Sequence, residues 1–182
     1  MPVTKSTTRS SATRTKRLPT RPKAHRATSS QPGDLKRTPS LKLRTILVPV
    51  DFSERSRAAL SYARALAQDC GASLVVLHVL DPILAPGRLE SPRLRELKSS
   101  SRTEAAEQLQ ALGHELAGTG VRTRLVLRQG AAANIILTVA VAKKADLIIM
   151  SSQGRTGLNR MMIGSVAERV VRHAYCSVLV VR

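Results

Sequence analysis

Aromatic residues are scarce in this chain of 182 residues, which contains one Phe, two Tyr and no Trp. Proteins that hold single-stranded nucleic acid commonly stack its bases on aromatic side chains. The three aromatic residues here, Phe52, Tyr62 and Tyr175, are too few and too far apart in sequence for such a platform.

Cysteines and long apolar stretches are also missing. The two cysteines, Cys70 and Cys176, suggest neither a disulfide framework nor a zinc site. A reduced, cytoplasmic setting is therefore expected. The longest apolar runs are the size of strands, such as 147–150 and 178–181. A membrane-spanning helix needs about 20 apolar residues, so no association with a membrane is expected.

Several signatures of enzymes are absent as well. The sequence has no Gly-x-x-x-x-Gly-Lys-Ser/Thr phosphate loop, no dinucleotide fingerprint after its first strand and no Gly-x-Ser-x-Gly nucleophile turn. Its histidines, His25, His78, His114 and His173, lie far apart without ligand spacing. We interpret His78 as a hydrogen-bonded core residue and Cys176 as a small buried one. No catalytic residue and no metal site are predicted.

Positive charge, by contrast, is abundant and unevenly distributed. The net charge is +18, and residues 1–44 hold 12 of the 30 Lys and Arg residues but only one acidic residue, Asp34. That segment therefore carries +11. The rest of the chain, with 18 basic and 11 acidic residues, carries +7. The meaning of the charge has to be considered separately for the two parts.

Residues 1–43 have the composition of a disordered basic tail. They are rich in Ser, Thr, Arg, Lys and Pro and show no hydrophobic periodicity. Such a segment cannot bury enough apolar surface to offset the entropy lost on ordering. Our first interpretation is a solvated extension, or the product of an upstream start codon. The second is an electrostatic arm that binds nucleic acid or another polyanion weakly. An organelle transit peptide ranks last, because no clear amphipathic helix is visible.

Residues 44–182 form a pattern of five strands that alternate with four helices, without an internal repeat. Strands are expected at 45–50, 73–80, 121–128, 146–150 and 177–181, and helices at 55–70, 93–117, 132–144 and 164–173. Short apolar runs between helices are typical of parallel strands covered on both faces. With right-handed crossovers, the pattern predicts an α/β fold: a five-stranded parallel sheet, doubly wound into a three-layer α/β/α sandwich.

In such a sheet, ligands bind at the carboxyl ends of the strands, where the strand order reverses. Asp51 comes directly after the first strand. Its carboxylate can accept hydrogen bonds from an exocyclic amine or a sugar hydroxyl. It can also cap the next helix, in competition with Ser53. The two roles are compatible, and both stay open.

Two segments rich in small residues follow the fourth strand. The glycines of 151–157 let a backbone approach a ligand closely, although this stretch alone is typical of an ordinary loop. At 164–166 a helix begins, and its free amides and positive dipole end suit an anion unless Ser165 is merely the N-cap. Both segments can face one crevice, one toward a sugar and one toward a phosphate. Arg155 and Arg160 add positive charge nearby.

The strands and the residues after them resemble the universal stress protein family. The resembling segments are 46–53, 77–79, 146–150, 154–157, 164–172 and 178–181, which together cover the chain from about residue 44 to 182. The basic tail has no counterpart. The resemblance implies an adenine nucleotide alpha hydrolase-like fold. It also implies a cytoplasmic stress-response protein that binds ATP, with or without Mg²⁺, for regulation and not for catalysis.

The family's nucleotide-binding members carry Gly, two residues, Gly, nine residues, and then Gly followed by Ser or Thr. Gly154, Gly164 and Ser165 match this spacing, but Ser151 stands where the first glycine belongs. The resemblance implies that the nucleotide contacts Pro49, Asp51, Val79, Met150, Ser151, Gly154, Gly164, Ser165 and Val166.

Each part of the nucleotide has its expected partners in that set. Asp51 would contact the adenosine moiety and the backbone of Val79 the adenine edge. Ser151 and Gly154 would line the ribose and phosphates, and 164–166 would hold phosphate. The departure at Ser151 predicts a weakened site, with backbone strain if its φ is positive. Slow ATP hydrolysis is ranked low because it needs positioned water and usually Mg²⁺ ligation.

In the universal stress protein family, the last strand commonly pairs with its copy in a second subunit, and the resemblance implies the same for 177–181. An apolar strand left as an exposed edge is an aggregation hazard, so a homodimer is expected. Tyr175 and Ser177 replace prolines that the family often has beside the residue matching Cys176. The alternative function is a dimeric interaction protein without nucleotide, in which Ser151 blocks the site and the tail binds a polyanion.

Overall fold

The computed structural model describes residues 42–82, 91–154 and 163–182. The chain divides into two compact units, Met1–Ser40 and Leu41–Arg182, and every element reported below belongs to the second. The interpretation of the N-terminal segment as a basic tail lies outside the described residues. The same holds for Arg155, Gly157 and Arg160.

One parallel sheet forms the centre of the second unit. Its strands are β1 (Thr45–Val50), β2 (Ser73–Leu80), β3 (Thr123–Gln129), β4 (Leu147–Ser151) and β5 (Ser177–Val181). They lie in the order β3-β2-β1-β4-β5, and every neighbouring pair is parallel. The order reverses at β1, since β2 and β3 lie on one side of it and β4 and β5 on the other. A crevice is therefore expected where the carboxyl ends of β1 and β4 diverge.

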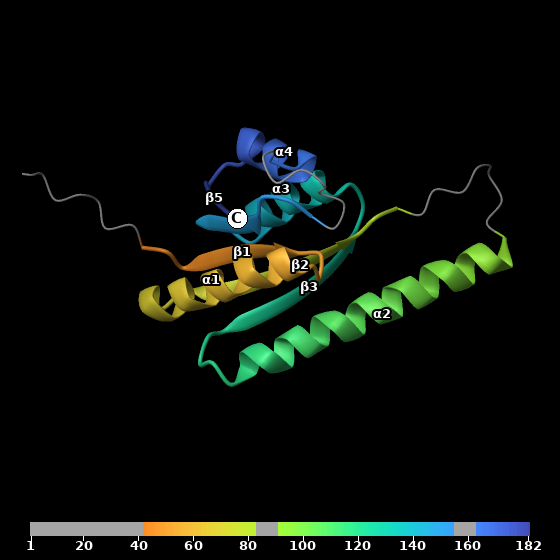
Figure 1. Cartoon of the computed structure of the whole chain (residues 1–182), viewed down its shortest axis with the longest axis horizontal. Helices are drawn as coiled ribbons and strands as arrows, with labels where there is room; N and C mark the ends of the chain where they lie inside the picture. Colours follow the sequence, from red (N-terminus) through yellow and green to blue (C-terminus); the bar gives the residue numbers. More distant parts are fainter. Residues whose placement is uncertain (1–41, 83–90, 155–162) are drawn as a thin grey trace, which may run out of the picture. The chain divides into compact units, whose positions relative to one another are not determined.

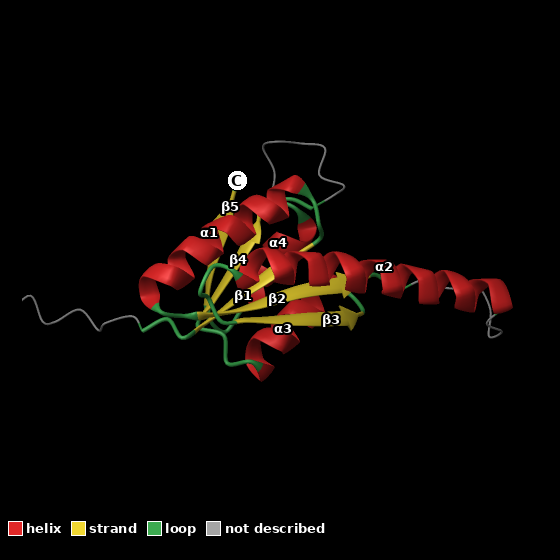
Figure 2. Ribbon diagram, turned by 90° about the horizontal axis from the view of Figure 1, so that it is seen from below, coloured by secondary structure: helices red, strands yellow, loops and turns green. Residues whose placement is uncertain are grey.

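Four helices cover the two faces of this sheet (Figures 1 and 2). They are α1 (Glu54–Cys70), α2 (Pro92–Ala117), α3 (Ala132–Ala142) and α4 (Ser165–His173). One hydrophobic cluster joins the sheet to α1 and α2, and a second joins it to α3 and α4. Neighbouring strand residues alternate between the clusters, as Ile149 and Met150 do. The predicted α/β/α sandwich is confirmed. None of the described helices is long and apolar enough to cross a membrane.

The ends of the elements follow local sequence signals. Ser53 caps α1 by accepting a hydrogen bond from the Ser56 N–H, as proposed, and Gly71 ends this helix with a φ of 67°. Ser91 caps α2 in the same way, with proline in the first turn. These signals made the boundaries of α1 and α2 predictable within one residue.

Several boundaries differ from the prediction, among them both ends of β4, which lie one residue later than predicted. The third strand begins at Thr123 and not at 121, because its ladder with β2 runs from Thr123 to Gln129. The third helix ends at Ala142, since Lys144 adopts a left-handed φ of 51° that no helix continues. Gly164, not Ser165, is the N-cap of α4. The alternative reading of Ser165 as that cap is wrong, because Ser165 is already the first helical residue.

Candidate functional site

A cavity of about 460 Å³ opens at the carboxyl ends of the strands, between them and the N-termini of α3 and α4. All nine residues that the sequence predicted for the nucleotide line it: Pro49, Asp51, Val79, Met150, Ser151, Gly154, Gly164, Ser165 and Val166. They come from four separate segments of the chain, and the sheet topology brings them to one crevice.

The cavity has further walls that sequence reasoning missed. Ala132 and Ile136 of α3 line it, as do Asp81 and the buried Gln153. Asp81 follows β2 just as Asp51 follows β1, so the rule that selected Asp51 also points to Asp81. Gln153 carried no such signal, because a polar residue in a loop is ordinarily solvated. The charged side chains among the described lining residues are the two carboxylates.

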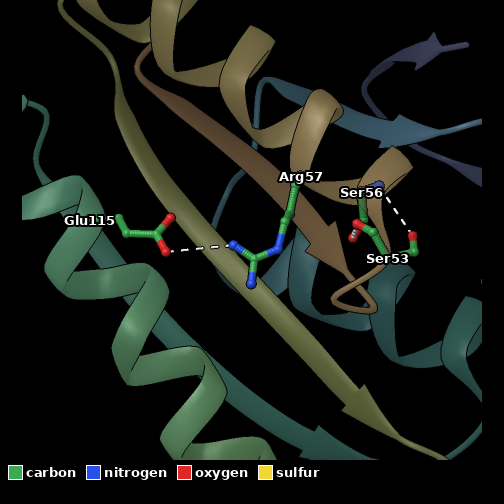
Figure 3. A network of polar contacts seen from close by, with 4 residues as sticks. All are labelled: Ser53, Ser56, Arg57 and Glu115. Atoms are coloured by element: carbon green, nitrogen blue, oxygen red, sulfur yellow. Dashed lines mark hydrogen bonds and ion pairs between the residues drawn. The ribbon is translucent and has the colours of Figure 1, made fainter.

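The Asp51 carboxylate is held by the turn between β1 and α1. Its Oδ1 accepts hydrogen bonds from the Ser53 N–H at 3.1 Å and from the Ser53 hydroxyl at 2.5 Å. The interpretation of Asp51 as the cap of α1 is wrong, because Ser53 accepts the bond from the helical amide of Ser56 at 3.2 Å (Figure 3). Asp51 thus orients the capping residue and at the same time faces the cavity.

Ser56 closes this network from the first turn of α1. Its hydroxyl donates to the Ser53 carbonyl oxygen at 2.9 Å and accepts from the Asp51 N–H at 3.4 Å. The side chain of Ser56 is almost completely buried. Two serine hydroxyls therefore each donate one hydrogen bond and accept another, which fixes the hydroxyls and restricts the carboxylate rotamer.

Gly154 lies against the same carboxylate. A Cβ atom at Gly154 would lie 3.0 Å from Asp51 Oδ2, a tight contact that the carboxylate could relieve only by shifting slightly. Gly164 is similarly enclosed, since its Cβ would lie 3.3 Å from the Ser152 carbonyl oxygen, to which its own N–H donates at 2.7 Å. Steric crowding therefore favours glycine at both positions, whether or not a ligand is bound.

A side-chain hydrogen bond ties the two halves of the site together. The Arg55 Nη1 of α1 donates to the Gln153 Oε1 at 2.9 Å. Gln153 is only 5% exposed, and it belongs to the segment between β4 and α4. The bond therefore links the turn that carries Asp51 to the segment that carries Gly154.

Ser151 is accommodated in the sheet without strain. It is the last residue of β4 and pairs with Val181 of β5. The described non-glycine residues with positive φ are Phe52 and Lys144, so the condition under which Ser151 would be strained is not met. Side chains alternate along a strand, and Met150 faces α3 and α4. Strand alternation therefore predicts that the Ser151 side chain lies on the sheet face opposite to that of Met150, and Ser151 lines the cavity as well.

The N-terminus of α4 completes the cavity with unpaired positive polarity. Gly164 has extended backbone angles and no side-chain cap bond. The first amides of a helix have no intrahelical partner, and the dipole adds positive potential there. Because Gly164, Ser165 and Val166 all line the cavity, this end of it suits an anion. Among the described residues, no group of three or more His, Cys, Asp or Glu side chains could hold a metal ion.

A larger and shallower hollow, of about 970 Å³, lies elsewhere, between α3 and the segment from His173 to Cys176. It contains none of the residues at the carboxyl ends of the strands, so we do not assign it to the predicted site. Burial raises the pKa of the Cys176 thiol, and the Asp146 carboxylate raises it further. Cys176 is half-buried, whereas the sequence predicted that it would be buried.

His78 occupies the core position expected for it. The residue is 8% exposed, and its Nδ1 lies 2.7 Å from the Val50 carbonyl oxygen. A carbonyl oxygen only accepts, so the ring donates from Nδ1. His78 does not line the cavity in which Asp51 lies.

The parallel sheet, its strand order and the crevice at the reversal define an adenine nucleotide alpha hydrolase-like α/β protein. Within that class, the universal stress protein family model matches residues 42–182. The chain belongs to the universal stress protein family.

Individual relatives agree with this membership. A universal stress protein of Thermus aquaticus is 39% identical over 140 residues, which cover 76% of this chain and 98% of that protein. Universal stress protein MJ0531 of Methanocaldococcus jannaschii is 36% identical over 140 residues, covering 75% and 81%. The structure of UspA from Lactobacillus plantarum superposes with a TM-score of 0.72 at 29% identity, covering 78% of this chain and 99% of that one.

Two more distant structures share the fold. One is a universal stress protein in complex with cAMP, at 20% identity and a TM-score of 0.59, covering 78% of this chain and 98% of that one. The other is the universal stress protein of Archaeoglobus fulgidus in complex with dAMP, at 22% identity and a TM-score of 0.55, covering 78% and 99%.

Proposed function

We propose that this protein binds an adenine nucleotide, ATP in the first place, in the cavity at the carboxyl ends of the strands. The proposal rests on one observation: four segments of the chain line a single crevice of about 460 Å³. These segments contain Asp51, Val79, Gly154 and Gly164. Distant proteins of the same fold have been solved with cAMP and with dAMP. Both ligands contain an adenine base joined to a pentose, which is ribose in cAMP and deoxyribose in dAMP.

The residues divide between the two ends of the nucleotide. The Asp51 carboxylate, already oriented by Ser53, would accept from the adenine amine or a ribose hydroxyl. The backbone at Val79 would meet the base edge. The phosphates would lie at the start of α4 and accept from the amides of Ser165 and Val166, because the Gly164 N–H already donates to the Ser152 carbonyl oxygen. The helix dipole favours negative charge there. Mg²⁺ on the phosphates would offset repulsion from the Asp51 and Asp81 carboxylates that line the cavity.

We propose a regulatory role in the stress response and not a catalytic one. The described groups at the phosphate end are backbone amides and serine hydroxyls, which bind phosphate but are poor proton acceptors. Nucleotide occupancy would then act as the signal. Both cysteines are free, which is compatible with the reduced cytoplasm that we propose as its location.

Calorimetric titration of ATP into the full-length protein, with and without Mg²⁺, tests the proposal. We expect micromolar binding, lost in Gly164→Val because the added side chain crowds the Ser152 carbonyl and the phosphate position. Gly118→Ala is the matched control, since a Cβ there meets nothing within 4 Å. Absence of binding up to millimolar ATP would contradict the proposal and favour an interaction protein without nucleotide.

We also propose that two copies associate through β5. This strand is the edge of the sheet, and its residues from Val178 to Val181 are only half-buried. Beside it, Tyr175 is 90% exposed. An apolar edge strand presents unpaired backbone groups that a second copy would satisfy. Dimerisation is compatible with either functional candidate, with nucleotide or without.

A further inference from the structure

Phe52 has an unusual backbone conformation at the centre of the site. It lies between Asp51 and Ser53 with a φ of 65°, the left-handed region that favours glycine. A large side chain rarely adopts this conformation, and such residues cluster at functional sites where the surroundings hold them in place. The conformation lets the Ser53 N–H reach back to Asp51 Oδ1 at 3.1 Å. Phe52 is therefore part of the device that sets the carboxylate.

His78 holds the Phe52 ring from the neighbouring strand. The two rings have centroids 4.2 Å apart and planes inclined by 31°. His78 is itself buried, and its Nδ1 donates to the Val50 carbonyl oxygen at 2.7 Å. That carbonyl lies one residue before Asp51. The imidazole thus contacts both the end of β1 and the side chain of Phe52, while His78 is not part of the cavity lining.

We propose that Phe52 and His78 are positioning residues that fix the Asp51 carboxylate for the ligand before it binds. This inference rests on the proposed nucleotide binding. Without the ring contact, the turn gains other conformations in which Asp51 no longer accepts from Ser53. The carboxylate must then be ordered when the ligand binds, which lowers affinity. A glycine at residue 52 would suit the backbone angle but would leave the turn free to move.

Three variants of the full-length protein test this by titration with ATP. Phe52→Gly should weaken binding about five- to tenfold, the size expected when one side chain must be ordered on binding. Phe52→Tyr, which keeps the ring contact, should stay within about twofold of the wild type. His78→Asn offers a side-chain amide near the position of Nδ1 as a donor to the Val50 carbonyl oxygen, but it removes the aromatic ring. It should reproduce the loss, and its effect should not add to that of Phe52→Gly.

A double-mutant cycle with Asp51→Asn separates positioning from a general structural effect. If Phe52 acts through the carboxylate, Phe52→Gly has little further effect on ATP affinity once Asp51 is changed. An equal loss in both backgrounds would overturn the proposal, and so would unchanged affinity of Phe52→Gly. Tyr62→Ala, an exposed aromatic on α1 outside the cavity, is the control and should bind like the wild type.

Amide hydrogen exchange at Ser53, measured without nucleotide, distinguishes this inference from the proposed function. We expect faster exchange in Phe52→Gly and His78→Asn than in the wild type, because the bond to Asp51 opens more often. Protection equal to the wild type would overturn the positioning role even if ATP binds. If the wild-type protein binds no ATP while Ser53 exchange still depends on Phe52, the proposed function is wrong. The turn is then ordered by Phe52 but has no nucleotide to bind.

Discussion

Ser151 shows how one residue at the family's glycine position is tolerated. Ser151 lines the cavity as the last residue of β4, and strand alternation predicts that its side chain lies on the face opposite to that of Met150. The φ of Ser151 is not positive, so a side chain carries no backbone cost there. We therefore predict that Ser151 does not block the site. A nucleotide could approach the same peptide groups with serine as with glycine.

Ser151→Gly is accordingly expected to change ATP affinity by less than about threefold. It should lower the free energy of unfolding by about 0.5–1 kcal/mol, because glycine in a strand loses more conformational entropy on folding. Calorimetry with ATP and urea denaturation measure the two effects. A tenfold or larger gain in affinity would show that the serine does weaken the site.

At the scale of the elements, the β1–α1 turn combines a structural task with the ligand contact that we propose for Asp51. Ser53 caps the N-terminus of α1 with its hydroxyl oxygen and donates to Asp51 from the same hydroxyl. Further along α1, the Arg57 Nη1 lies 3.5 Å from the Glu115 Oε1 of α2 (Figure 3). Both of these side chains are at least half exposed, so solvent screens their attraction. The cap should therefore matter more for stability than the ion pair.

Ser53→Ala should lower the free energy of unfolding by about 1 kcal/mol, the usual cost of a lost N-cap. Arg57→Ala, as the matched change on the same helix, should lower it by less than about 0.5 kcal/mol. Urea denaturation of both variants gives the comparison. ATP affinity should fall in Ser53→Ala only, since Asp51 loses the hydrogen bond from the Ser53 hydroxyl there. An equal effect of the two variants on stability would contradict this ranking.

At the scale of the whole molecule, the exposed edge of β5 is the feature that a monomer leaves unused. Leu179 lies in the middle of this strand and is half-buried in the single chain. Leu179→Lys should convert a dimer into a monomer, because a charge would be placed in an apolar strand contact. Light scattering at micromolar concentration measures the mass. A wild-type protein that is monomeric under these conditions would rule out the dimer.

The second prediction at this scale concerns polyanion binding by the basic N-terminal segment. If residues 1–43 bind a polyanion, affinity for nucleic acid should fall on the order of a thousandfold between about 50 and about 200 mM salt. Removing residues 1–43 should abolish that binding and leave ATP affinity unchanged. Fluorescence anisotropy with a labelled oligonucleotide measures it. Binding that survives the deletion would place the nucleic-acid contact in the folded part.

The sequence by itself determined the local structure of this protein. Apolar runs and helical spacing gave five strands and four helices in the right order, because these periodicities reflect burial on one or two faces. Ser53, Gly71 and Gly164 mark helix ends through caps that act within a few residues. The spacing of Gly154 and Gly164 identified the candidate site through the family resemblance.

Only the tertiary structure decided how distant residues meet. It placed Gly154 against Asp51 Oδ2 and the Phe52 ring beside His78. These relations depend on the strand order β3-β2-β1-β4-β5 and on the register between strands. Both are set by packing between segments up to about a hundred residues apart, as in the Arg55–Gln153 hydrogen bond. Local propensity carries no information about such contacts, so the sequence could name the site residues but not their geometry.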